Sequence, residues 1–174
     1  ATVVTKMREA GAILMGKENL CEFASGPTGY NPHYGNIHNP WDLNRISGGS
    51  SGGTGASVGS LQTFVSFGTD AGGSVRIPAV LCGGVGFKQT HGRVSLRGAL
   101  PPYSSSDHIA PVTRSVRDSA IALQAVAGYD DLDPTTAPVP VPDYLATLEE
   151  GIRGLTMGIP TNHYFDLVDS EVEA

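Results

Sequence analysis

Residues 47–79 read SGGSSGGTGASVGSLQTFVSFGTDAGGSVRIPA, and this stretch decides what kind of protein the chain is. Two loops of glycine and serine flank a segment with apolar positions at helical spacing, which predicts a helix over 54–65. The second loop, 68–74, ends at Ser74, and Pro78 follows where a new helix can begin, because proline fits the first turn. The sequence holds 23 glycines among 174 residues, well above the usual ~7%, and they are concentrated between 48 and 98. The backbone in this part must therefore turn sharply or approach another group closely.

Serine hydroxyls lie in both loops, at Ser50 and Ser51 in the first and at Ser74 in the second. Gly72 and Gly73 allow the chain before Ser74 to direct successive backbone N–H groups toward one point. An oxyanion hole requires this arrangement, since a developing alkoxide needs fixed donors about 3 Å away. A hydroxyl directly after such a loop is well placed as an acyl-transfer nucleophile. It also needs a base, a role open to Ser50 acting with a lysine.

The two loops, together with CGGVGFKQTHGRVSLRG at 82–98 and SSSDHIAPVTRSVRD at 104–118, resemble the signature region of the amidase signature family. The resemblance extends over roughly 10–133 and implies a role for each loop serine. Ser74 matches the nucleophile, Ser50 matches a serine in a cis peptide bond that relays the proton, and Ser51 supplies a supporting hydroxyl. The resemblance implies an oxyanion hole made by the backbone N–H groups of Ala71, Gly72, Gly73 and Ser74.

The reaction implied by the resemblance is hydrolysis of a carboxylic amide to an acid and ammonia or an amine, through an acyl-enzyme on Ser74. It needs no organic cofactor and no metal. The family's third catalytic group is a lysine that precedes the helix at the start of this chain, and neither Lys6 nor Lys17 matches it. We therefore expect that lysine to lie outside 1–174 and the chain alone to be inactive or nearly so. Gln89 replaces a usual proline and Ala110 a usual glycine.

The residues around the second loop also suggest what holds it in place. The Arg76 guanidinium is more easily explained as the partner of a carboxylate such as Asp70 than as a substrate anchor. We expect Asp70 to support the loop by hydrogen bonds to its backbone.

Helical and strand patterns elsewhere indicate an α/β chain. The resemblance implies a central mixed β-sheet covered by helices on both sides, only partly present here, with 1–174 as part of a single domain truncated at both ends. Ser115 and Asp118 have the spacing of a capping box, which predicts a helix that Gly128 stops. The other elements expected are a helix over 1–11, a buried strand over 12–15, a loop over 19–45, a strand over 84–87, a surface excursion over 130–143, a strand over 156–160 and the beginning of a helix at 169–174.

Composition argues against several classes of protein. A net charge of −6 without a cluster of Lys and Arg argues against direct binding of nucleic acid, and the first residues carry neither a signal-peptide core nor a membrane-spanning run, so we expect no membrane partner. Cys21 and Cys82 are interpreted as reduced thiols in a cytoplasmic protein, with Cys82 in the core. The five histidines lack metal-ligand spacing, which argues against a metal site.

A different catalytic arrangement is compatible with the same serines. Gly48, Ser50 and Gly52 satisfy G-x-S-x-G, the nucleophile elbow of α/β-hydrolases, and either Asp107 or Asp130 with His163 would complete the chain order of that triad. The elbow requires a strand directly before it, and NPWDLNRIS at 39–47 has no strand pattern.

Three functions remain open at this point. The first is a free-standing amidase that acts on a small-molecule amide, either alone or as a homodimer, and HGRVSLRGALPPYSSSDH at 91–108 favours it. The second is the A subunit of a glutamyl-tRNA amidotransferase, with the same chemistry on glutamine and the ammonia passed to partner subunits. The third is an inactive binding or scaffold protein, which the intact loop serines argue against.

Overall fold

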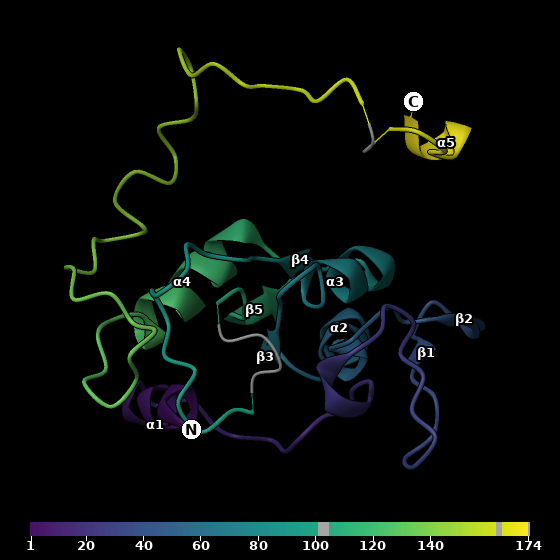
Figure 1. Ribbon diagram of the computed structural model, residues 1–174, viewed down its shortest axis with the longest axis horizontal. Helices are drawn as coiled ribbons and strands as arrows, with labels where there is room; N and C mark the ends of the chain where they lie inside the picture. Colours follow the sequence, from purple (N-terminus) through teal and green to yellow (C-terminus); the bar gives the residue numbers. More distant parts are fainter. Residues whose placement is uncertain (101–104, 163–164, 174) are drawn as a thin grey trace.

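A short, fully buried strand is the centre of the fold. The computed structural model describes residues 1–100, 105–162 and 165–173 (Figure 1). Strand β5 (Ile109–Thr113) is buried at every position. Strands β3 (Val65–Thr69) and β4 (Val85–Gly86) pair with it on either side, both antiparallel, in the order β3-β5-β4. The register places Thr69 opposite Ile109, so β3 ends beside the start of β5.

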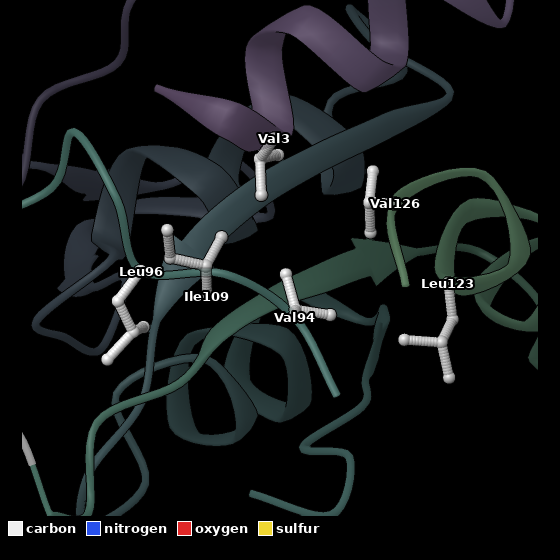
Figure 2. Close-up of a cluster of buried hydrophobic side chains, with 6 residues drawn as sticks. All are labelled: Val3, Val94, Leu96, Ile109, Leu123 and Val126. Carbon is white, nitrogen blue, oxygen red and sulfur yellow. The ribbon is translucent and has the colours of Figure 1, made fainter. Parts of the chain in front are cut away.

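Helices cover both faces of this sheet. Successive side chains of a strand point to opposite faces, and β5 accordingly contributes to two cores. On one side, Ile109 packs with Val3 of α1 (Thr2–Glu9) and with Leu123 and Val126 of α4 (Val116–Val126). Val94 and Leu96, from the segment after β4, complete this cluster (Figure 2). Ala110 and Val112 pack on the other side with residues of α2 (Gly52–Gly59) and α3 (Arg76–Cys82), namely Val58 and Ala79, and with Val75. The predicted α/β fold with two helical layers is confirmed; the strand pairings that the structure describes are antiparallel.

Local signals placed several elements correctly. The Ser115 side chain accepts a hydrogen bond from the Asp118 N–H at 3.1 Å and caps α4, as its spacing predicted. Pro78 lies in the first turn of α3, and Gly83 ends that helix with φ +80°. The predicted strand over 84–87 is β4. The helix over 1–11 is α1, and the C-terminal helix is α5 (Ser170–Glu173).

Other predictions were wrong in extent or kind. The helix expected over 54–65 ends at Gly59, because 65–69 pairs with β5 instead. The segments 12–15 and 156–160 form no strand in the described part of the chain, and Ile13 and Ile159 are exposed. A strand needs a neighbour for its backbone N–H and C=O groups, and neither segment has one among the described residues. The expected loop over 19–45 contains a short helix η1 (Glu22–Ala24) and a hairpin of β1 (His38–Asn39) and β2 (Asp42–Ile46).

The predicted surface excursion over 130–143 begins with a buried network. The Asp130 carboxylate accepts hydrogen bonds from Thr2 Oγ1 at 2.7 Å, Ser95 Oγ at 2.8 Å and Arg97 Nε at 3.1 Å. Asp133 is also buried and accepts from the Leu96 N–H at 2.6 Å. These polar side chains are inside because their partners lie on α1 and on the segment after β4. Asp130 therefore ties three distant parts of the chain together.

This network predicts a pH dependence of stability. Hydrogen bonds from Thr2 and Ser95 lower the pKa of Asp130 from 3.8 to about 2. A lowered folded-state pKa gives stability that is fully present above pH 3.8 and is lost as the pH falls through 3.8 toward 2. In urea unfolding, Asp130→Asn should be less stable than wild type near neutral pH and should lose less stability on acidification. The neighbouring exposed Asp131→Asn should behave like wild type. Equal acid sensitivity of Asp130→Asn and wild type would contradict this account.

Candidate active site

The two serine loops meet at the end of β3. The Ser51 N–H donates to the Ser74 carbonyl at 3.1 Å, which joins the first loop to the second. The Ser51 hydroxyl accepts from the Thr69 N–H at 3.0 Å and donates to the Thr69 carbonyl at 3.2 Å. Ser51 thus lies between the last residue of β3 and the residue expected to be the nucleophile. This bond brings together the two loops that carry Ser50, Ser51 and Ser74.

Glycine is required at two of these contacts by close approach. A Cβ on Gly68 would overlap the Ser51 side chain, so β3 reaches Ser51 only without a side chain there. A Cβ on Gly55 would lie 2.5 Å from the Pro78 carbonyl oxygen, so α2 and α3 pack with their backbones almost touching. Both contacts hold the loops at one end of the helix pair.

Ser50 and Ser74 differ in their surroundings. Ser50 is fully buried, its peptide bond to Gly49 is cis, and its carbonyl accepts from the Cys21 N–H at 2.9 Å. The Ser50 hydroxyl has no hydrogen-bond partner within the described residues. Ser74, by contrast, is half-buried. Ser74 is therefore the more exposed of the two serines, and the buried Ser50 hydroxyl is the one that lacks a hydrogen-bond partner among the described residues.

Asp70 shapes the loop that carries Ser74. It is fully buried, and its carboxylate accepts from the N–H groups of Gly73 at 2.8 Å and Val75 at 3.1 Å. The Arg76 guanidinium donates to both carboxylate oxygens, from Nη2 at 3.0 Å and Nε at 3.1 Å. Burial alone would raise the pKa of Asp70, but the hydrogen bonds from Arg76, Val75 and Gly73 outweigh it and lower that pKa. The expected pairing of Asp70 with Arg76 is present.

The same bonds decide which N–H groups of the loop are already engaged. The Gly73 N–H is engaged by Asp70, so it is not the free donor that the sequence predicted. The N–H groups of Ala71, Gly72 and Ser74 donate to no acceptor in the described part of the protein. Three N–H groups close in sequence to the half-buried Ser74 hydroxyl thus have no acceptor among the described residues, and unbonded donors of this kind are one requirement for stabilising an alkoxide.

Sequence reasoning missed Lys88, and the structure adds His108 to the residues that hold the loop. Lys88 Nζ donates to the Ala71 carbonyl at 2.8 Å, within the same loop. The backbone of His108 exchanges two hydrogen bonds with Asp70, at 2.9 and 3.1 Å, and extends the β3–β5 pairing to the start of the loop. Burial lowers the pKa of His108, and the nearby positive charge of Lys88 lowers it further. The signal available in the sequence was a lysine just beyond the strand expected over 84–87.

The structure also argues against the nucleophile-elbow alternative, but not for the reason inferred from the sequence. The prediction that 39–47 contains no strand was wrong, because β2 ends directly before Ser47. No sequence pattern indicated this strand, since β2 is exposed at every position and has no buried face. The Ser50 hydroxyl is buried, whereas an elbow exposes its nucleophile. Asp130 is engaged by Thr2, Ser95 and Arg97, and His163 lies outside the described residues.

The remaining candidate groups lie in structural positions. Cys82 is buried, its thiol donates to the Ser47 carbonyl at 3.4 Å, and burial raises its pKa to about 11. Lys6 donates to the Ala127 carbonyl at 2.8 Å, and Lys17 is exposed. Across the described residues, no three metal-ligating side chains gather at one point, and no helix is long and apolar enough to cross a membrane.

The chain is similar to known proteins along its whole length. The family model described as Amidase matches residues 1–174. The A subunit of glutamyl-tRNA(Gln) amidotransferase from Syntrophus aciditrophicus (strain SB) is 51% identical over 99% of this chain and 36% of its own length. The crystal structure of its counterpart from Thermotoga maritima is 48% identical with a TM-score of 0.86, over 88% of this chain and 34% of that one. A 6-aminohexanoate cyclic dimer hydrolase is 42% identical with a TM-score of 0.79, over 87% and 32%. The chain thus spans about a third of the length of these relatives.

The geometry of Asp70 predicts a large effect of a small change. Asp70→Asn places an amide N–H₂ against N–H donors and removes the charge opposite Arg76, so the free energy of unfolding should fall by about 2–4 kcal/mol. The matched control is Asp42→Asn, which disrupts an exposed ion pair with Arg45 (3.5 Å) and should change stability little. Denaturant unfolding of both variants measures this, and equal effects would show that Asp70 does not hold the loop.

Proposed function

The chain belongs to the amidase family, and from that premise we propose that the protein hydrolyses a carboxylic amide through an acyl-enzyme on Ser74. The observation that carries the proposal is the half-buried Ser74 next to N–H groups that donate to no described residue, backed by the buried Ser50 hydroxyl. This arrangement joins a nucleophile, a proton relay and an oxyanion site within two loops.

The reaction proceeds in two stages. Ser74 Oγ attacks the amide carbon, a C–O bond forms, and the electron pair of the carbonyl moves onto its oxygen. The N–H groups of Ala71, Gly72 and Ser74 stabilise that oxyanion. The C–N bond then breaks, the proton from Ser74 reaches the leaving nitrogen through Ser50, and ammonia or an amine departs. Water attacks the acyl-enzyme, releasing the acid and restoring Ser74.

The base that activates Ser50 is assigned to a lysine outside 1–174. The sequence contains Lys6, Lys17 and Lys88, and the Ser50 hydroxyl is hydrogen-bonded to none of them. About two thirds of the length of the relatives lies outside the matched segment, which supports 1–174 as part of a single larger domain. On this proposal the 174 residues alone have little or no activity.

Both cysteines are free thiols, which supports a cytoplasmic location.

A second candidate uses the same site. The relatives named above include the A subunit of a glutamyl-tRNA(Gln) amidotransferase, 51% identical to this chain, which favours glutamine as the amide and transfer of ammonia with partner proteins. Dependence on a partner separates the two candidates. A free-standing amidase hydrolyses its amide at the same rate alone, whereas the amidotransferase component requires its partner proteins for full activity on glutamine.

Covalent labelling tests the nucleophile. A fluorophosphonate should label Ser74 in the full-length protein, as mapped by peptide mass spectrometry, and should label the 174-residue chain poorly because the base is absent. Ser74→Ala should lose the label and reduce kcat by more than about 10⁴-fold. The control variant Ser60→Ala, at an exposed serine, should keep the label on Ser74 and a wild-type kcat.

Two results would contradict this assignment. A label on Ser50 would establish the nucleophile-elbow reading instead. The absence of label and of amide hydrolysis in the full-length protein would support the third function, a binding or scaffold protein.

A further inference from the structure

The Ala71–Gly72 peptide group is held on one side only. Its carbonyl accepts a hydrogen bond from Lys88 Nζ at 2.8 Å, and its N–H, on Gly72, donates to no described residue. Gly72 is exposed, and a Cβ placed on it would meet nothing within 4 Å. No side chain or neighbouring backbone among the described residues therefore restrains this peptide from the Gly72 side.

The orientation of this peptide decides the sign of the charge presented to an oxyanion. In a trans peptide the C=O and N–H point in opposite directions. While Lys88 binds the Ala71 carbonyl, the Gly72 N–H points away from Lys88. If the peptide flips, the carbonyl oxygen takes the place of the N–H, and a partial negative charge replaces a donor.

Lys88 is itself firmly placed. It follows β4, and the residue before it, Phe87, donates its N–H to the Pro111 carbonyl of β5 at 3.1 Å. The residue after it, buried Gln89, donates through Nε2 to the Ile109 carbonyl at 2.9 Å. Both neighbours are thus bonded to the central strand. Among the described residues, no carboxylate forms an ion pair with Lys88. The ammonium group is directed to the loop rather than to an acidic partner.

We infer that Lys88 is a positioning residue that fixes the Ala71–Gly72 peptide with its N–H toward the oxyanion. The inference rests on the proposed function at Ser74. Asp70 holds the end of the loop at Gly73 and Val75, and Lys88 holds its beginning at Ala71. The two anchors from opposite ends define the oxyanion site.

The test compares two lysines that make the same bond. Lys88→Met removes the donor and keeps the length of the side chain; Lys6→Met is the matched control, since Lys6 also donates to a backbone carbonyl at 2.8 Å, on Ala127 at the C-terminal end of α4. In the full-length protein, Lys88→Met should lower kcat about 10–100-fold, less than outright loss of an oxyanion donor, with KM changed less than about threefold. Lys6→Met should leave both constants unchanged. Lys88→Arg, which keeps a donor, should restore most of kcat.

A second readout reports the oxyanion site directly. A trifluoromethyl ketone analogue of the substrate forms a tetrahedral adduct with an oxyanion, so Lys88→Met should weaken its binding by the same factor as it lowers kcat/KM. Thermal melts of both variants show whether each is folded. If Lys88→Met matches Lys6→Met in kcat and in ketone affinity, the inference that Lys88 positions the Ala71–Gly72 peptide is wrong. If Ser74→Ala is as active as wild type, the proposed function itself fails, so the two failures are distinguishable.

Discussion

The buried carboxylate of Asp70 is the constraint on which the site depends. It receives two hydrogen bonds from the Arg76 guanidinium and three from backbone N–H groups, of Gly73, Val75 and Arg76. A fully buried charge is costly unless it is paired and hydrogen-bonded, so the loop must keep the shape that presents these donors. That shape directs some N–H groups inward to Asp70 and leaves others available outside. The fold of the loop therefore decides which of its N–H groups Asp70 binds and which it leaves unbound.

The sheet carries this constraint to the rest of the molecule. Asp70 directly follows β3, and its backbone pairs with His108, which precedes β5. Because β5 is buried on both faces, its register fixes β3, β4 and the helices that cover them. The loops that follow β3 and precede α2 therefore meet at one end of the sheet. Lys88, which follows β4 in the chain, donates to the Ala71 carbonyl of the same loop, and β4 lies on the other side of β5 from β3.

Sequence patterns predicted best where the cause is local. The cap at Ser115 and the helix start near Pro78 depend on residues within a few positions of one another. They predicted least where a segment needs a distant neighbour. The segments 12–15 and 156–160 were expected to be strands but pair with nothing described, while β2 is a strand that is exposed at every position.

The sequence by itself placed serine hydroxyls in two glycine-rich loops, and the resemblance of these loops to the amidase signature family predicted the class of reaction. It also identified Ser50, Ser51 and Ser74 as the candidate residues for that reaction. Only the tertiary structure decided which backbone N–H groups are free, that Asp130 is buried, and that Lys88 reaches Ala71. Those outcomes depend on bonds between residues 17 positions apart for Lys88 and Ala71, and 128 apart for Thr2 and Asp130. A local sequence pattern does not predict such distant partners, because the register of β5 and the packing on its two faces bring these residues together.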